Sequence, residues 1–294
     1  MSPVDGLLLV DKPEGETSTR SLAVARRALG IRKAGHTGTL DPFATGLLPL
    51  AMGEATKFSR FLLDADKSYQ ARLRLGAIST TGDTEGEISE VGRFCGDIAE
   101  VERVLSGLVG EQTQVPPMHS AVRVDGKRLY DLAREGIIIE RAPRKIAIKS
   151  IECLELSPNF LEFSVTCSKG TYVRTLGEEI GRRLGCGGYL TALRRTAIGR
   201  FRVDDSITPS QLVEMGQEAA RELLLPAEVL VESLDRIDIG DRDAWAFCNG
   251  QVIGASGPAG GEVALFGPGG RFLGVAREAG GRLAPCRLMA TGHG

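Results

Sequence analysis

Apolar and polar residues alternate in several stretches of the chain, a pattern typical of strands with one buried face. The clearest stretch is 68–76, SYQARLRLG. Its inward face would carry Tyr69, Ala71, Leu73 and Leu75. Strands are also predicted over 145–156 and 161–167, and the apolar run Leu7–Val10 predicts a buried strand that ends in a turn at Asp11-Lys12-Pro13.

Helices are predicted where capping signals flank longer segments. Thr17 and Ser18 can cap a helix that runs to about Leu29, and Gly30 ends it. Further helices are predicted over 54–63, 97–108 and 172–184.

These elements do not alternate in a regular strand-helix-strand rhythm, so the pattern favours an antiparallel or mixed sheet with one covered face and an α+β domain. Past Pro226 the character changes, since glycines crowd 250–281 and short strands are predicted over 262–266 and 272–275. We therefore predict a main domain over 1–232 and a small all-β domain over 233–294.

Composition narrows the possible functions. The 294 residues carry a formal net charge of −2, so any surface that binds nucleic acid must be a local cluster of cations. Six cysteines without a CxxC pair and three histidines predict neither a metal site nor a disulfide framework. No apolar run is long enough for a bilayer or a signal peptide, and we expect a cytoplasmic protein.

One carboxylate stands out in the loop AGHTGTLDPFATGLL, residues 34–48. Asp41 precedes a proline, and a turn role explains that pattern without any chemistry. The glycines lack the GxxxxGK[ST] pattern of a phosphate-binding loop, and the chain has no GxSxG hydrolase elbow. The chemical alternative is Asp41 as a nucleophile or an acid/base, with His36 on the same loop. His36 is equally compatible with a histidine that only packs in the loop.

Two other residues have both a structural and a functional interpretation. Tyr69 lies on the inward face of its strand, where a core tyrosine is common. Arg174 lies early in a predicted helix between Val173 and Leu176. A buried arginine needs a carboxylate partner, because burying it unpaired costs several kcal/mol. Asp41 is a candidate for that partner.

A basic segment covers about 117–145. Its cations are Arg123, Lys127, Arg128, Arg134, Arg141, Arg144 and Lys145. With His119 and Tyr130 nearby, it can hold a phosphate backbone and stack on bases. Because acidic residues are interspersed, a solvated helix face explains the same charges.

Together these pieces resemble the bacterial pseudouridine synthases of the TruB type, which act on the T-loop of transfer RNA. The resemblance runs from about Gly6 to Phe201. It rests on GLLLVDKPEG, GHTGTLDPFATGLLPLAMGEATK, KSYQARLRLG, PPMHSAVRVDGKRLYDLAREG, CSKGTYVRTLGEEIGRRLG and YLTALRRTAIGRF.

The resemblance implies a pseudouridine synthase fold and a small C-terminal RNA-binding domain of the PUA type. It implies isomerisation of the T-loop uridine at position 55 without any cofactor, after that nucleotide has left its stack. Asp41 would be the nucleophile, Arg174 its ion-pair partner that keeps it charged and lowers its pKa, and Tyr69 a stacking residue whose hydroxyl can transfer a proton.

The resemblance also implies how the RNA is held. Tyr172 and Leu193 would line the pocket, and His36 would pack against the T-loop. Phosphates would be contacted by Lys12, Lys57 and Lys127. The segment 117–145 would form a flap over the T-loop, and the C-terminal domain would touch the acceptor end. No obligate protein partner is implied.

Two alternatives remain. The archaeal and eukaryal guide-RNA-dependent synthases of the dyskerin type share the aspartate loop, but the complete segment 120–144 favours an enzyme that grips its own RNA. Alternatively, the protein is mainly an RNA-folding chaperone for which modification is secondary, and the two activities can coexist.

Overall fold

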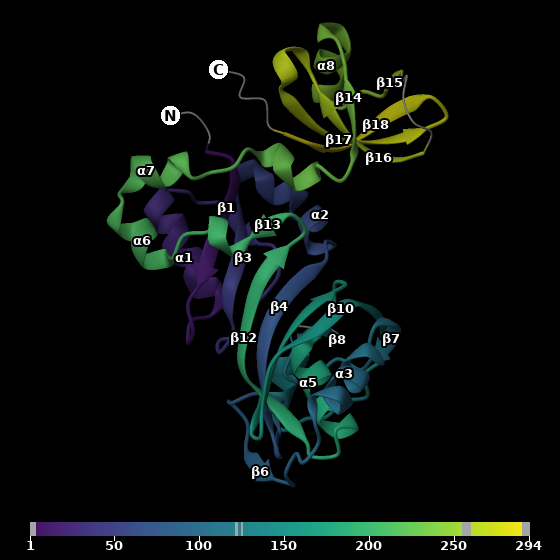
Figure 1. The fold of residues 1–294 in the computed structure, drawn as a ribbon. Coiled ribbons are helices and arrows are strands. Elements are labelled where there is room, and N and C mark those ends of the chain that lie inside the picture. Colours follow the sequence, from purple (N-terminus) through teal and green to yellow (C-terminus); the bar gives the residue numbers. More distant parts are fainter. Residues whose placement is uncertain (1–3, 121–122, 125, 255–259, 290–294) are drawn as a thin grey trace.

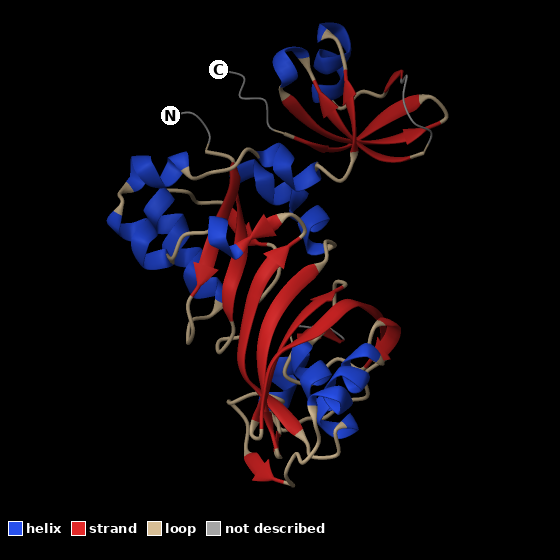
Figure 2. Ribbon diagram, in the orientation of Figure 1, coloured by secondary structure: helices blue, strands red, loops and turns tan. Residues whose placement is uncertain are grey.

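The structure is a computed structural model that describes residues 4–120, 123–124, 126–254 and 260–289. Figure 1 shows a long central sheet with helices near both of its ends, and a smaller second sheet in the C-terminal part of the chain. The separation of helices from strands is clearest in Figure 2.

Nine strands form the central sheet. They are β1 Gly6–Lys12, β2 Ala34–His36, β3 Thr45–Met52, β4 Lys67–Leu75, β7 Gly110–Gln114, β10 Arg144–Ser157, β11 Phe160–Cys167, β12 Gly188–Ile198 and β13 Phe201–Arg202. The order is β1-β3-β12-β4-β11-β10-β7, with β2 beside β3 and β13 beside β12. β3 and β12 run parallel, whereas every other described pair in this sheet is antiparallel. The predicted α+β class with a mixed, mostly antiparallel sheet is confirmed.

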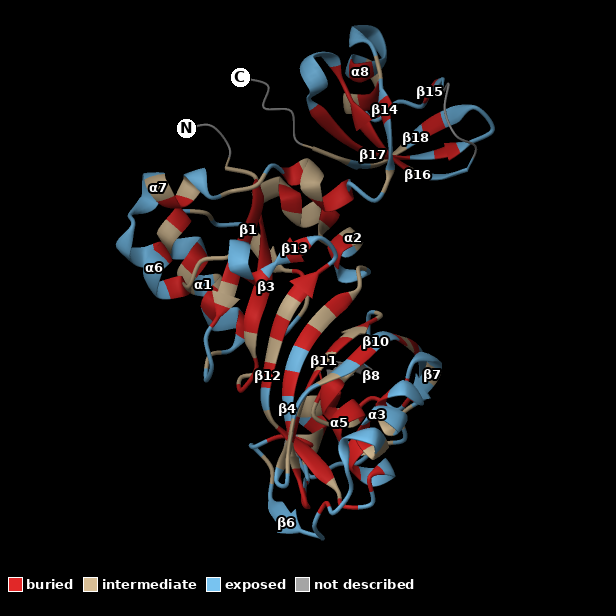
Figure 3. Cartoon of the chain, viewed as in Figure 1, coloured by how far each residue is buried: buried red, intermediate tan, exposed pale blue. Residues whose placement is uncertain are grey.

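The sheet has one covered face along its centre. β4 buries the predicted set Tyr69, Ala71, Leu73 and Leu75. Gln70 and Arg72 on the other face are exposed, and Figure 3 shows the alternation along the strand. Helices α3 (Ile98–Ser106) and α5 (Val173–Arg183) pack against the sheet and share the core of its buried face. The covered face therefore forms the main core.

The first helix matches its capping signals. In α1, Ser18–Leu29, the Thr17 side chain accepts a hydrogen bond from the Arg20 amide, and Gly30 ends the helix with a φ of +67°. α1 packs against α6 (Pro209–Glu214) and α7 (Gln217–Glu222) beside the β1 edge of the sheet.

The remaining elements of the main domain are short. The helix predicted over 54–63 is a 3-10 helix, η1 Gly53–Phe58, followed by α2 Ser59–Leu63. The others are β5 Ala77–Ser79, β6 Ile88–Glu90, β8 Arg123–Val124, β9 Lys127–Arg128, α4 Leu129–Arg134, and the 3-10 turns η2 Val203–Asp205 and η3 Ala227–Val231. Within the described ranges, every helix is too short or too polar to cross a bilayer.

The second sheet lies in the C-terminal part of the chain. Its strands are β14 Asp235–Asp238, β15 Ile253–Gly254, β16 Gly261–Phe266, β17 Phe272–Ala279 and β18 Arg282–Leu288, with the 3-10 turn η4 Pro268–Gly270. The prediction of a β-rich C-terminal part is confirmed, but this part is not all-β, because it also contains the helix α8, Asp241–Cys248. α8 forms because Ala244 and Phe247, three residues apart, can both be buried on one helix face.

Candidate active site

The loop between β2 and β3 carries Asp41 on a fixed backbone. The Ala44 amide donates to the Asp41 carbonyl (3.1 Å), which closes the predicted Asp-Pro turn. The Leu40 amide donates to the Ser18 hydroxyl (2.9 Å), and that hydroxyl donates back to the Leu40 carbonyl (3.1 Å). The turn therefore exists, and it presents the Asp41 side chain from an anchored position.

Lys12, the last residue of β1, anchors the same loop. The prediction that it contacts a phosphate is wrong, because its residue is completely buried at 0% exposure. Its Nζ donates to the carbonyls of Pro13 (2.8 Å), Glu16 (2.7 Å) and Pro42 (3.2 Å). Burial lowers the pKa of Lys12 to about 8. An ammonium enclosed by three carbonyls fastens the Asp41 loop to β1 and is shielded from RNA.

Arg174 is paired with Asp41. Its Nε lies 3.0 Å from Asp41 Oδ2, and its Nη1 lies 3.1 Å from Asp83 Oδ2. The guanidinium also donates to the carbonyls of Thr81 (2.9 Å) and His119 (2.6 Å). The Arg174 side chain is 4% exposed, whereas Asp41 keeps 37% of its side-chain surface exposed. Four contacts therefore fix the position of the arginine, and the arginine orients the one accessible carboxylate, that of Asp41.

The ionisation of Asp41 differs from the expectation. Burial raises the pKa of Asp41, and the neighbouring Asp83 charge raises it further, while Arg174 and Lys12 act in the opposite direction. The expectation that Arg174 leaves Asp41 with a lowered pKa is therefore wrong. A carboxylate with a raised pKa is a better base and nucleophile once it is ionised.

Asp41 opens into a pocket of about 280 Å³. The residues that line it are Gly38, Thr39, Leu40, Asp41, Leu63, Lys67, Tyr69, Ser120, Gly170, Thr171, Tyr172, Val173, Arg174, Leu193 and Arg195. Five of the predicted site residues thus share one hollow, namely Asp41, Tyr69, Tyr172, Arg174 and Leu193. Aromatic and aliphatic walls around one carboxylate suit a flat, mostly apolar ring such as a nucleobase.

His36 lies outside the lining of this pocket. It ends β2 and is half-buried, and its Nδ1 is buried without a hydrogen-bond partner in the described structure. Burial lowers the pKa of His36. A neutral imidazole at this place fits a packing role better than proton transfer to a substrate in the pocket.

The two other predicted phosphate contacts remain predictions. The Lys57 Nζ pairs with Glu54 and donates to the Leu288 carbonyl (2.8 Å). A phosphate would have to share or displace these partners. Lys127 lies in β9, but its side chain is outside the described part of the structure.

Three buried polar residues at the site were not predicted from the sequence. Asp83 is 1% exposed and accepts hydrogen bonds from the Thr81 hydroxyl (2.5 Å) and the Glu85 amide (3.0 Å). Lys67 and Arg195 line the pocket from β4 and β12. The available signal was their position, since Lys67 and Arg195 are cations at inward-facing positions of alternating strands.

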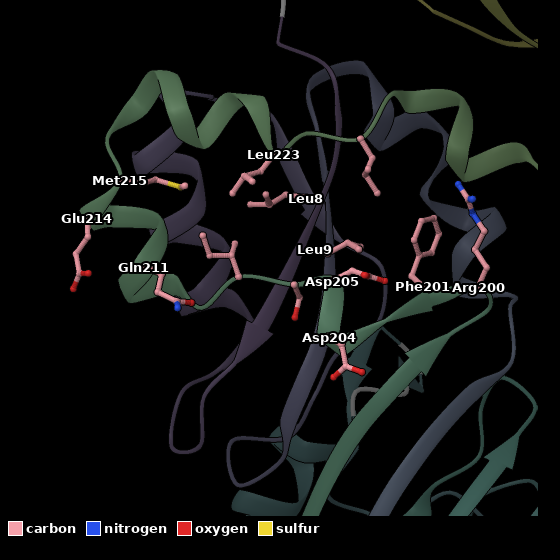
Figure 4. A pocket seen from close by; sticks show the side chains of 13 residues that line it. Leu8, Leu9, Arg200, Phe201, Asp204, Asp205, Gln211, Glu214, Met215 and Leu223 are labelled. Atoms are coloured by element: carbon pink, nitrogen blue, oxygen red, sulfur yellow. The ribbon is translucent and has the colours of Figure 1, made fainter.

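A larger hollow of about 1070 Å³ lies elsewhere, between β1 and the segment 200–225. Figure 4 shows Asp204, Asp205 and Glu214 among its side chains and Arg200 at one end. Its carboxylates would repel phosphates, and it shares no lining residue with the Asp41 pocket. The smaller pocket is therefore the candidate site.

Comparison with known proteins covers almost the whole chain. Residues 26–173 match the TruB family pseudouridylate synthase N-terminal domain, 174–232 match the tRNA pseudouridylate synthase B C-terminal domain, and 236–289 match the pseudouridine synthase II TruB C-terminal model. The tRNA pseudouridine synthase B of Aromatoleum aromaticum is 50% identical over 98% of this chain and 94% of its own length. The protein of the same name from Thiobacillus denitrificans is 46% identical, over 98% of this chain and 97% of its own.

Solved structures agree in fold. The crystal structure of a Cbf5-Nop10-Gar1 complex matches with a TM-score of 0.74 and 27% identity over 97% of this chain and 84% of that one. An H/ACA RNP bound to a substrate RNA containing 2'-deoxyuridine matches with a TM-score of 0.74 and 26% identity, over 97% of this chain and 85% of that one. With three family models in chain order and relatives at 46–50% identity, this chain belongs to the TruB family of pseudouridylate synthases.

Proposed function

We propose that this protein isomerises the T-loop uridine of transfer RNA to pseudouridine, with Asp41 as the nucleophile and without a guide RNA. As a TruB family member it is a pseudouridine synthase, and its relatives named tRNA pseudouridine synthase B support transfer RNA as the substrate. The observation that carries the proposal is the accessible Asp41 carboxylate, aimed by buried Arg174 into an aromatic and aliphatic pocket.

The chemistry uses an ionised, aimed carboxylate. The uridine first leaves its stack, which costs a few kcal/mol. The bond from ribose C1′ to N1 then breaks, the base turns, and C5 is joined to C1′. An ionised and oriented Asp41 is required in each possible route: attack on uracil C6, attack on ribose C1′, or elimination assisted by Asp41. Tyr69 would stack on the displaced base and transfer protons, while Tyr172 and Leu193 form walls.

The basic segment 117–145 is proposed as the flap that covers the RNA. Arg174 bonds both Asp41 and the His119 carbonyl, so the start of this segment shares a partner with the nucleophile. We infer that the position of the flap and the orientation of Asp41 are coupled. His36 would pack against the T-loop, and Lys57 and Lys127 would contact phosphates.

The C-terminal part, 233–294, is proposed as a PUA-like domain that contacts the acceptor end of the RNA. We also propose a cytoplasmic location, because all six cysteines carry free thiols, as is usual in a reducing compartment. No obligate protein partner is proposed. The greater identity to tRNA pseudouridine synthases B than to Cbf5 complexes favours this over the guided alternative.

The central experiment incubates the pure protein with an unmodified T-stem-loop and no guide RNA, and then maps pseudouridine by sequencing. We expect modification of the loop uridine. Modification only after a guide RNA is added would contradict guide independence, and modification at another position would contradict the proposed target.

A second experiment separates catalysis from RNA handling. Asp41→Asn keeps the shape of the side chain but removes its charge, so we expect pseudouridine formation to disappear while affinity for the stem-loop changes little. The same variant tests whether the protein also assists RNA folding, since refolding of a misfolded transfer RNA would persist in it. A variant that still modifies RNA at the normal rate would exclude Asp41 as the nucleophile.

A further inference from the structure

Arg195 is a buried cation that the chemistry above does not use. Arg195 is 1% exposed, and among the described residues it is the largest side chain that is fully buried. Among the described residues, no carboxylate forms an ion pair with it, and the titratable group that favours its charge is the Tyr69 phenol. A buried charge is costly unless other groups stabilise it.

Part of that stabilisation comes from the Asp41 loop. Arg195 Nε donates to the Leu47 carbonyl (2.7 Å), and its Nη2 donates to the Gly38 carbonyl (3.1 Å). Gly38 lies in the loop before Asp41, and Leu47 lies in β3 after it, so one guanidinium ties the loop and the strand that follows it to β12. Gly46 permits the close approach, because a Cβ there would lie 2.3 Å from the Arg195 carbonyl oxygen.

Tyr69, which lies beside Arg195 in the pocket lining, provides the remaining stabilisation of the Arg195 charge. Arg195 and Tyr69 are directly opposite each other in the β12–β4 pair, and both line the pocket. Burial raises the pKa of Tyr69, Cys167 and Asp41 act in the same direction, and Arg195 acts against them. Lys67 lines the pocket from β4, two residues before Tyr69, but it directs its Nζ to the carbonyls of Leu63 and Ala65.

We propose that Arg195 is a positioning residue for the isomerisation: it fixes the Asp41 loop to the sheet and stabilises the negative charge on Tyr69 when that phenol has given up its proton. The proposal rests on the proposed function. As the C1′–N1 bond breaks, the Tyr69 phenol gives its proton to the departing uracil. After the C5–C1′ bond has formed, the phenolate takes the proton from C5, so Tyr69 ends as it began and no co-reactant is needed.

The first test needs no RNA. 3,5-Difluorotyrosine is placed at position 69, because its more acidic phenol titrates while the protein is folded, and ¹⁹F NMR follows its ionisation. In Arg195→Met we expect the pKa of this phenol to rise by about one unit or more, since an adjacent opposite charge is lost. Arg195→Lys, which keeps the charge, should retain most of the wild-type value.

Arg194→Met is the matched control. Arg194 neighbours Arg195 on β12, but it pairs with Asp11 at 2.8 Å and its side chain is 40% exposed. Its removal also takes one positive charge from the strand, and we expect it to leave the titration at position 69 unchanged. An equal shift in Arg194→Met and Arg195→Met would overturn a specific effect of Arg195.

The second test uses the stem-loop. Arg195→Met should lower kcat about 100-fold or more, as loss of a preorganised electrostatic group does, while the Kd for RNA stays near wild type. Arg195→Met combined with Tyr69→Phe should lose less than the product of the two single losses, because the effect through Tyr69 is already gone and only the anchoring of the Asp41 loop remains to be lost. If the Met variant fails to fold, Arg195→Gln serves in both tests.

The outcomes separate the two proposals. The action of Arg195 on Tyr69 would be overturned by an unmoved phenol pKa in a folded Arg195 variant, or by single losses that multiply in full in the double variant. If the wild-type protein does not modify the stem-loop, the proposed function fails, whereas the RNA-free titration still reports whether Arg195 acts on Tyr69.

Discussion

At the scale of single residues, two neighbours act on Asp41 in opposite directions: Arg174 orients it and favours its ionised form, whereas the carboxylate of Asp83 opposes its ionisation. Arg174 contacts both Asp41 and Asp83, so the two negative charges share one positive charge. Because 37% of the Asp41 side chain is exposed, Asp41 is the accessible member of this group. Asp83 is buried and bonded inside the protein, so in the proposed reaction it would act only through Asp41.

This arrangement predicts a pH effect. The charge of Asp83 raises the pKa of Asp41, so Asp83→Asn should lower it. Since the proposed reaction needs ionised Asp41, the acidic limb of the kcat/KM profile should move to lower pH. Asparagine keeps an oxygen that can accept from the Glu85 amide. Asp204→Asn, in the remote hollow, is the control that should leave the limb in place. An acidic limb that stays or moves upward in Asp83→Asn would contradict the prediction.

The sequence predicted the Asp41–Arg174 contact, because a buried arginine needs a carboxylate and a lone carboxylate was available. It did not predict Asp83, because nothing in the local sequence indicates that this residue is buried. It did not predict Arg195 either, whose one signal is its inward-facing position on β12. Asp83 becomes a site residue only when folding brings it to Arg174, far along the chain. Lys12 was misplaced for a related reason, because its motif does not reveal that three carbonyls enclose its ammonium.

At the scale of elements, periodicity succeeded where one face of an element is buried. The strand β4 and the helix α1 were predicted because alternation or caps mark them. The helix α8 was missed, since its eight residues bury only two side chains and lie just before the glycine-rich, strand-forming stretch 250–281. The 54–63 helix was right in place but changes from 3-10 to α at Ser59.

The end of β1 gives a prediction at this scale. The pKa of Lys12 is lowered from 10.5 to about 8 in the folded protein, so between these values the unfolded chain binds more protons. The free energy of unfolding contributed by Lys12 therefore rises with pH from about 8 to 10.5. Urea titrations should show this rise in wild type relative to Lys12→Met. Parallel pH profiles in the two proteins would disprove it.

At the scale of the whole molecule, the two sheets share a core. Phe58 of η1 meets Phe272 of β17 with ring centroids 5.0 Å apart, and Arg60 pairs with Glu262 across the same boundary. One apolar cluster contains residues from both parts. The C-terminal part is thus packed onto the catalytic part, so a contact with the far end of a bound RNA would be held at a fixed place.

This shared core predicts cooperative unfolding. The sole tryptophan, Trp245, lies in α8, so its fluorescence reports the C-terminal part, whereas circular dichroism reports the whole. The two transitions should coincide in wild type. Phe272→Ala should cost about 3–5 kcal/mol and make the fluorescence transition occur first. The exposed Val252→Ala is the control. Separate transitions in the wild type would show that the boundary does not couple the parts, and coincident transitions in Phe272→Ala would show that Phe272 does not couple them.

Net charge gives the last prediction. With a charge of −2 the molecule has no general attraction for RNA, so affinity must come from few local cations. If Lys127 of the flap neutralises a phosphate, Lys127→Ala should weaken stem-loop binding and reduce the slope of log K against log salt by about one. Arg200→Ala removes a cation that pairs with Glu232 beside the acidic hollow, and it should leave the slope unchanged. An unchanged slope in Lys127→Ala would instead assign the charges of the flap to a solvated face, because only a cation that releases counterions on binding can change that slope.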